Sequence, residues 1–563
     1  LAEDPDYRTG VDVFWRPSSN LQFAATLLPD FGTVESDDVV VNLTSFETFF
    51  PEKRLFFLEG SEIFETSPRS NVLARLSSSS SSSGGRQTAS DFNPTPTTLL
   101  NTRRIGGPAV DPDLPGSIAI NDVDLGKPTD LHGAVKLTGQ MGPVRFGVLG
   151  AFEDDPEFVG TDVLGNVYQI VQEGRDFGAV RFLYESVTGS RQSLGWMSTA
   201  VVHGAGDAFV HGLDGHYLSE SGEWKVDGQL IASDAHGVEG YGGFGDIVYV
   251  PRRGHRHQLT LDYLDENLNV NDFGFIRRND DITARYSFSH TTSAWPMFRN
   301  VRSSISYNHG MNLDGRGTRL GLFLRSTMTL HSLNSITAAF MYFPRKWEDR
   351  NTRGNGDYRV EERWGTEIAW GTNTGKPFSY SIGTSVQQEE LGDPTYQLKT
   401  GFTYKPTDRF SLDFDLSYRR RHNWLVYQGG RRVTAFHADE WKPKVALDVF
   451  LSSKQQLRFT LQWAGIKADE SELYQVPIGD GYLIPYLRDP ADMSIDDFTL
   501  SRLTTQLRYR WEIAPLSDLF VVFTRGSNVP DRVDDSFDRL LRDALTDPVI
   551  DLFVVKLRYR FGN

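Results

Sequence analysis

The feature that most constrains this chain is an alternation of apolar and polar side chains with a period of two residues. It is clearest in residues 551–561, where the apolar positions are Phe553, Val555, Leu557, Tyr559 and Phe561. The positions between them are Val554, Lys556, Arg558 and Arg560. Successive side chains of a strand point to opposite faces, so this segment predicts a β-strand with one apolar and one basic face. Residues 410–419, 457–463 and 503–513 alternate in the same way.

Two classes of all-β protein show such alternation, the soluble sandwich and the transmembrane barrel. The mean hydropathy is −0.39, but a barrel needs only ~10-residue strands that are apolar at alternate positions. Aromatic residues make up 12% of the chain and recur near predicted strand ends, as at Trp463 and Trp511, which is typical of interfacial girdles. A soluble β chain of 563 residues should divide into domains with visible linkers, and none is visible after residue 130. We therefore expect residues 1–563 to form an all-β fold, a single large antiparallel transmembrane β-barrel of about 22–26 strands.

The connections between the predicted strands are of two kinds. Short turns that contain Pro, Gly or Asn are predicted at residues 17–20, 142–143, 406–408 and 514–518. Long polar loops are predicted at residues 467–494 and 526–548. In outer-membrane barrels the short turns are periplasmic and the long loops extracellular. Residues 11–15 would then run toward the periplasm, and a partner strand before them is missing or unrecognised.

Residues 29–105 do not follow the strand pattern and form an irregular insert. Residues 46–60 are dense in both aromatic and charged side chains, and they either fold inward as a plug or constriction or cap a hairpin outside. The candidates for a constriction are Phe49, Phe50, Glu52, Lys53, Arg54, Phe56, Phe57 and Glu59. Residues 77–83 are all serine and are followed by two glycines, which predicts a flexible loop.

A basic set of side chains is predicted to face the lumen near the end of the chain. It consists of Arg508, Arg510, Lys556, Arg558 and Arg560. Rings of Arg or Lys favour anions, so this set could line a solute path. The alternative is that it pairs with inward acids such as Glu512, Asp413 or Asp415 and makes the lumen rigid.

The composition disfavours several other functions. The chain has no cysteine, which excludes disulfides and thiolate metal sites, and its net charge of −16 argues against a nucleic-acid partner. Residues 240–245 match a dinucleotide-binding glycine pattern, but a strand-like run follows where a helix is required. His255 and His257 share a strand face without a third ligand. We expect no catalytic residue, no metal and no cofactor.

Residues 29–35, 41–43 and 46–60 closely resemble a family of bacterial outer-membrane β-barrel proteins of unsettled activity. The sequence NLTSFETFFPEKRLFFLEG at residues 42–60 is specific to this family. Residues 103–106, 517–523 and 554–561 resemble later sequence blocks of the same family. Members usually carry an N-terminal domain similar to family 9 carbohydrate-binding modules. That domain and a secretion signal are expected upstream of Leu1, so sugar binding is not assigned to these residues.

The resemblance implies a barrel in the outer membrane of a Gram-negative bacterium. The expected partners are the lipid bilayer, lipopolysaccharide, the barrel-assembly machinery during biogenesis and an envelope protein, and the barrel itself is expected to be monomeric. The first functional hypothesis is a porin-like or gated conduit for solutes such as saccharides. The second is a structural or assembly subunit of an envelope complex, for secretion or as the sheath of an electron conduit. An outer-membrane hydrolase is the third, and no nucleophile supports it.

Overall fold

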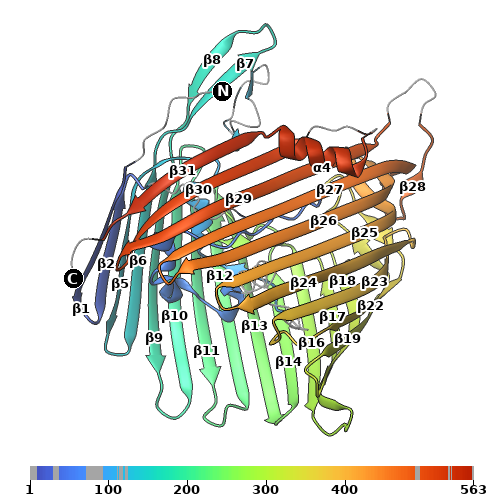
Figure 1. The fold of residues 1–563 in the computed structure, drawn as a ribbon, viewed down its shortest axis with the longest axis horizontal. Helices are drawn as coiled ribbons and strands as arrows, with labels where there is room; N and C mark the ends of the chain where they lie inside the picture. The colour runs from blue at the N-terminus through green and yellow to red at the C-terminus, as the bar shows by residue number, and fades with distance from the viewer. Residues whose placement is uncertain are drawn as a thin grey trace.

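The computed structural model describes residues 9–29, 37, 39–71, 93–110, 112, 114, 118–120, 125–488, 495–529, 533 and 535–560. Their dominant element is one antiparallel sheet of 24 strands (Figure 1). The prediction of an all-β fold built on one large antiparallel sheet is confirmed. No helix in this described part is long and apolar enough to cross a membrane.

The first half of the sheet consists of β1 (Val11–Ser18), β2 (Leu21–Leu27), β5 (Leu131–Met141), β6 (Val144–Glu153), β9 (Asp176–Ser186), β10 (Arg191–Val202), β11 (Ala208–Leu218), β12 (Trp224–Ala235), β13 (Val238–Arg252), β14 (His255–Leu264), β16 (Asp281–Thr292) and β17 (Phe298–Met311). The second half consists of β18 (Gly317–Leu330), β19 (Ser335–Phe343), β22 (Arg363–Gly371), β23 (Phe378–Gln388), β24 (Pro394–Thr407), β25 (Phe410–Gly429), β26 (Arg432–Ser452), β27 (Gln455–Gln475), β28 (Ile484–Pro485), β29 (Phe498–Ala514), β30 (Ser517–Val529) and β31 (Ile550–Arg558). The glycine-rich residues 240–245 lie inside β13 and form no nucleotide-binding turn.

Smaller elements lie in the connections between these strands. Two-stranded pairs join β3 (Thr97–Thr98) to β15 (Phe275–Ile276) and β20 (Lys346–Glu348) to β21 (Tyr358–Val360), and β4 (Ile118–Ile120), β7 (Glu157–Asp162) and β8 (Val167–Val171) form a third small sheet. The helical segments are α1 (Leu55–Leu58), η1 (Ser61–Phe64), η2 (Pro68–Asn71), η3 (Thr102–Arg104) and α4 (Phe537–Thr546).

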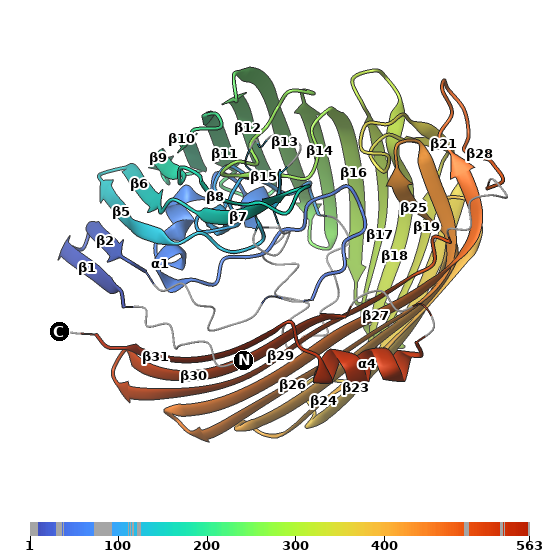
Figure 2. The ribbon, with the colours of Figure 1, turned by 90° about the horizontal axis from the view of Figure 1, so that it is seen from above.

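The sheet curves around an interior but does not close, so the expected closed barrel is not observed. Its edges are β1 and β31, which face each other across a gap in Figure 2 and do not pair within the described residues. Apart from the two-residue β28, which pairs only with the end of β27, 23 strands cross the sheet. Neighbours are antiparallel, so an odd number makes β1 and β31 run in the same direction. An antiparallel ladder cannot join two such edges.

The two ends of the sheet differ as the turn pattern predicted. One end carries short turns at residues 19–20, 142–143, 408–409, 453–454 and 515–516. The other carries the long connections at residues 28–130, 265–280, 344–362, 476–497 and 530–549. Two boundaries in the prediction were wrong, because β27 continues to Gln475 and β30 to Val529 before the long loops begin. The serine tract at residues 77–83 and Phe561 lie outside the described residues.

The outward face of the sheet is apolar, in agreement with the alternation. In β31 the side chains of Phe553, Val555 and Leu557 are 67%, 59% and 61% exposed. Near the long-loop end, α4 packs its Leu540 and Ala544 on this outward face against Trp463 and Leu503 (Figure 1). The opposite, concave face carries polar and small side chains together with buried apolar residues such as Leu149, Phe177 and Met197.

Candidate functional site

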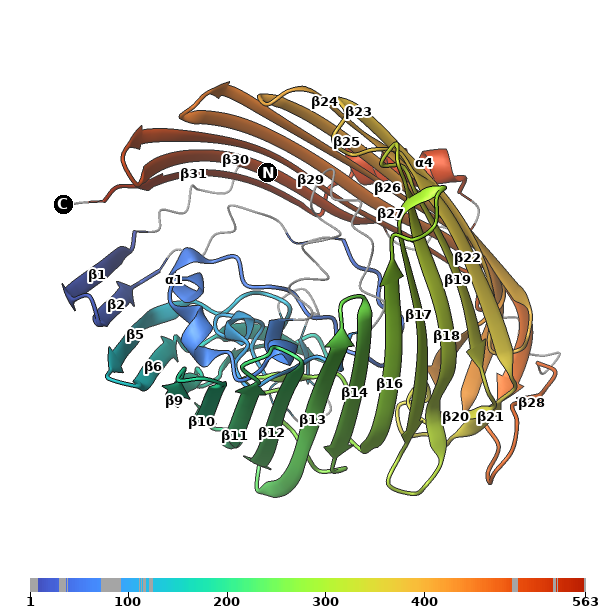
Figure 3. The ribbon, with the colours of Figure 1, turned by 90° about the horizontal axis from the view of Figure 1, so that it is seen from below.

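The described part of the insert, residues 29, 37, 39–71 and 93–105, lies on the concave side of the sheet (Figures 2 and 3). Its apolar side chains join one buried cluster with the inward residues of β5, β6, β9 and β10. The cluster includes Phe56, Phe57, Ile63, Phe64, Leu99, Ala134, Leu149, Ala151, Phe177 and Met197. Glycine allows close approach at Gly147 of β6, where a Cβ atom would stand 2.9 Å from the Phe64 ring. The insert therefore forms a shared hydrophobic core with β5, β6, β9 and β10 and is not separated from them by water.

A buried guanidinium fastens the insert to β13 and β14. Arg69, which is 1% exposed, donates two hydrogen bonds to Asp246 at 2.7 and 2.6 Å and pairs with Asp262. Arg285 of β16 also reaches Asp262 at 3.1 Å and donates to the Asn93 carbonyl at 3.1 Å. Three strands and two parts of the insert thus share one charge network. Loss of Arg69 would remove the counter-ion of the buried Asp246, and Asp262 would keep only Arg285.

A second polar contact joins the insert to β11 and β12. His216 places Nδ1 2.9 Å from Asp227, and its Nε2 lies 3.0 Å from both Asp214 and the Thr66 carbonyl of the insert. Arg181 donates to both carboxylate oxygens of Asp214. Both ring nitrogens face oxygen acceptors, and this arrangement suits the doubly protonated imidazolium, which donates from both.

The charged side chains proposed for a constriction make contacts within the insert and with β1 and β2. Glu52 accepts from Arg54 at 2.7 Å and from the Thr102 hydroxyl at 2.7 Å, and Arg54 also donates to the Ile105 carbonyl at 2.7 Å. Burial by itself would raise the pKa of Glu52, but the hydrogen bond and charge of Arg54, with the Thr102 hydroxyl, lower it below its usual value. Lys53 pairs with Asp37 at 3.1 Å. Glu59 accepts from Arg16 of β1 at 2.8 Å and from Gln22 of β2 at 3.0 Å.

The aromatic candidates are placed differently from one another. Phe56 and Phe57 are buried and pack edge to face at 5.1 Å. The Phe49 ring lies 5.2 Å from Phe275 of β15, and Phe50 is half-buried. On the opposite side of the interior, the Val39 amide donates to Gln462 of β27 at 2.9 Å. The insert thus contacts both walls of the curved sheet.

The basic set near the end of the chain meets an acid that the sequence did not single out. Arg510 and Arg558 donate to the two oxygens of Asp518 at 2.8 and 2.7 Å, and the Arg560 amide donates to Ser517 at 3.0 Å. Arg508 and Lys556 belong to the same inward rows of β29 and β31. Asp413 instead accepts from Thr403 and Ser411 at 2.6 and 3.0 Å. Asp518 is the second residue of β30 and lies directly opposite Arg558 of β31. The pairing could therefore be found only from the register of these two strands.

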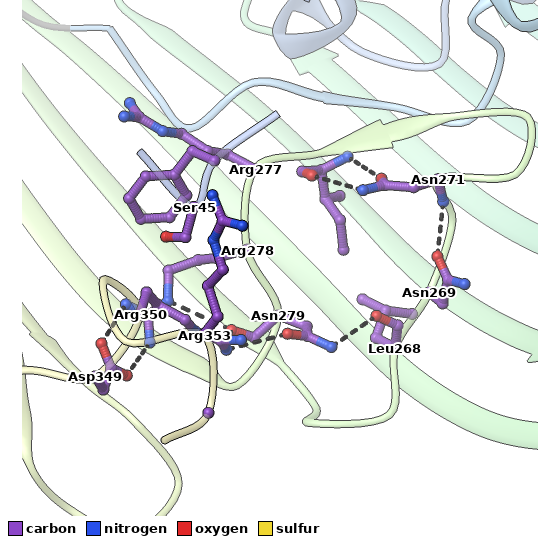
Figure 4. Close-up of a pocket in the computed structure, with 13 residues that line it drawn as sticks. Ser45, Leu268, Asn269, Asn271, Arg277, Arg278, Asn279, Asp349, Arg350 and Arg353 are labelled. Atoms are coloured by element: carbon purple, nitrogen blue, oxygen red, sulfur yellow. Dashed lines mark hydrogen bonds and ion pairs between the residues drawn. The ribbon is translucent and has the colours of Figure 1, made fainter. Parts of the chain in front are cut away.

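A pocket of about 370 Å³ lies at the long-loop end of the interior (Figure 4). Three segments far apart in the sequence line it: Ser45 and Phe46 of the insert, the connection between β14 and β16, and residues 349–354 of the connection between β19 and β22. Its charged lining residues are Arg277, Arg278, Asp349, Arg350 and Arg353. Positive groups thus outnumber negative ones four to one.

The four arginines of this pocket differ in their partners. Arg278 is buried and pairs with Asp349 at 2.7 Å, and Arg350 donates to the Asn279 carbonyl at 2.9 Å. The Arg277 guanidinium lies 4.6 Å from the centre of the Phe46 ring. Burial by the surrounding protein and the charge of Arg319 lower the pKa of Arg277. Among the described residues, neither Arg277 nor Arg353 has an acidic partner, and both side chains reach solvent.

The residues described above define a large curved antiparallel sheet with short turns at one end, long loops at the other and an insert packed inside. The chain belongs to the family described as "Domain of unknown function (DUF5916)", whose model matches residues 2–112 and 190–561. No curated protein sequence matches the chain. The comparisons do not show the domain similar to carbohydrate-binding modules that the resemblance led us to expect upstream.

Several solved structures are similar over much of their length. The FrpB iron transporter from Neisseria meningitidis (F3-3 variant) is 9% identical with a TM-score of 0.43, covering 70% of this chain and 74% of that one. The copper transporter OprC is 11% identical with a TM-score of 0.33, covering 70% and 71%. The CymD monoaromatic hydrocarbon channel is 13% identical with a TM-score of 0.17, covering 54% and 81%. These scores are too low to carry an argument about function.

Proposed function

We propose that this protein is an outer-membrane β-barrel of a Gram-negative bacterium that acts as a gated conduit for solutes, with the insert as its gate. The observation that carries the proposal is the position of the insert, which packs on one wall of the interior and touches the opposite wall at Gln462. The apolar outward face and the unequal ends of the sheet support placement in a bilayer. Short turns then face the periplasm, and the arginine-lined pocket faces the cell exterior.

Lipid cannot satisfy unpaired backbone groups, so the edges of β1 and β31 must find partners in the membrane. We propose that one further strand, antiparallel to both, completes the barrel. This gives an even strand number, as is usual in bacterial barrels. Direct pairing of β1 with β31 would instead need a parallel ladder.

Planar-bilayer recording tests the conduit. We expect little conductance from the native protein and a clear rise after deletion of residues 46–60, with correct folding checked by heat-modifiable migration in gels. A folded barrel that remains silent after this deletion would contradict the proposal.

The unpaired edges favour a second candidate, an envelope subunit whose barrel is completed by a strand of a partner protein. Native pull-down from gently solubilised membranes separates the two. Recovery of the chain alone, together with conductance, argues for the conduit.

A further inference from the structure

The arginine-lined pocket has a charge imbalance that its own residues do not correct. Its acid, Asp349, is paired with Arg278. The nearby Asp281 faces Arg278 at 3.9 Å and also pairs with Arg319. Arg350 lies 3.9 Å from Asp280. Arg277 and Arg353 therefore leave two positive charges without a counter-charge among the described residues.

We propose that this pocket binds the phosphate group of an incoming solute, either a phosphate monoester or inorganic phosphate. Two unpaired guanidinium groups match an oxyanion of charge near −2, and planar guanidinium groups bind phosphate oxygens through paired hydrogen bonds. This inference rests on the proposed function and names the substrate class of the conduit.

The pocket is held in shape before any ligand arrives. The side chain of Asn271 accepts from the Ile276 amide at 2.8 Å and donates to the Ile276 carbonyl at 3.2 Å. Asn279 donates to the Glu266 carbonyl at 2.6 Å, and Arg278 ties this connection to Asp349 on the other loop. Figure 4 shows these asparagine side chains in hydrogen bonds within the protein. Arg277 and Arg353 are therefore the charged groups available to a ligand.

The volume limits the size of the ligand. About 370 Å³ lies at the lower end of the range of roughly 300–1,000 Å³ that is usual for small-molecule sites. A phosphorylated monosaccharide fits this volume, whereas a polysaccharide does not. An anion here would also lie beside Ser45 and Phe46, so its binding would contact the insert itself.

Isothermal titration calorimetry on the full chain in detergent tests the site, with inorganic phosphate, glucose 6-phosphate and glucose as probes at constant ionic strength. We expect both phosphate probes to bind and glucose not to bind. Arg277→Gln and Arg353→Gln should each lower phosphate affinity at least tenfold. The control is Arg345→Gln, which lies in the same connection but pairs with Glu361 at 2.6 Å outside the pocket, and it should leave the affinity unchanged.

Absence of phosphate binding to the native protein, or equal affinities in the pocket variants and the native protein, overturns the proposal. Arg353 is exposed, so its variant keeps the test valid if Arg277→Gln does not fold. Conductance separates this inference from the proposed function. Phosphate binding to the native protein, with no conductance even after deletion of residues 46–60, retains the site and rejects the conduit. Conductance after that deletion, with no phosphate binding to the native protein, does the reverse.

Discussion

Two walls of the same sheet share an outward face but differ on the inward one. The packed wall, β5, β6 and β9–β14, presents small and apolar residues such as Gly147 and Ala151 to the insert. The polar wall, β23–β27 and β29–β31, presents cross-strand ion pairs such as Arg458 with Asp448 at 2.7 Å. Outward side chains have the same surroundings in both walls. Inward side chains contact the insert in the packed wall and mostly face water in the polar wall. The insert thus depends mainly on the packed wall, and the proposed solute path follows the polar wall.

The largest effect in this comparison is expected from Arg69→Met. The substitution removes the counter-ion of the buried Asp246 and leaves Asp262 with Arg285 alone. Breaking a buried ion pair in this way costs about 3–5 kcal/mol. We expect the insert to become protease-sensitive while the sheet stays folded. Limited proteolysis with mass spectrometry measures this.

The matched control for Arg69→Met is Arg458→Met on the polar wall. The Arg458 side chain is 32% exposed, against 1% for Arg69. Water therefore screens the Arg458–Asp448 pair more strongly, and we expect its loss to cost less. Equal protease sensitivity of the two variants would show that the walls do not differ in the way described.

A second, smaller effect is expected from Gly147→Val. Its side chain would overlap Phe64 and Ile63 of the insert, and overpacking of this kind costs about 1–3 kcal/mol. The control is Gly215→Val in β11, where a Cβ atom meets nothing within 4 Å. Thermal unfolding in detergent should distinguish the two, and a larger loss for Gly215→Val would contradict this packing.

A pH effect should follow from Glu52. Because its pKa is lowered in the folded protein, the carboxylate stabilises the insert above its usual pKa of about 4.3. This contribution is lost as the pH falls through the lower folded-state value. Proteolysis of the insert in the native protein should therefore increase as the pH is lowered from 7 to 3. In Glu52→Gln this part of the pH dependence should be missing, and an identical pH profile would contradict the assignment.

The smallest effect is expected from double-cysteine variants, which test whether the edge strands β1 and β31 pair with each other. The chain has no cysteine, so Val13→Cys combined in turn with Phe553→Cys, Val555→Cys or Leu557→Cys gives a clean readout of disulfide formation. An intervening strand separates the edges by about 9–10 Å, beyond the ~7 Å limit for a disulfide. We expect no cross-link in membranes, and efficient cross-linking would instead support parallel closure.

The alternation predicted the strands well because outward positions face one kind of surroundings throughout. The turn pattern also indicated that a partner strand before residues 11–15 is missing or unrecognised, and β1 is an unpaired edge of the sheet. It could not predict the partner of Arg558, because that depends on the register of β30 with β31. The pocket was missed for a similar reason: Phe46, Arg277 and Arg353 come together only through long connections without periodicity.

The central claim is that the insert gates a path along the polar wall. Single-channel conductance of Arg69→Met, compared with Arg458→Met and the native protein, tests it most directly. The account predicts frequent openings in Arg69→Met and near-native behaviour in Arg458→Met. A folded Arg69→Met protein whose insert is released, as shown by proteolysis, but which conducts no more than the native protein would contradict the account.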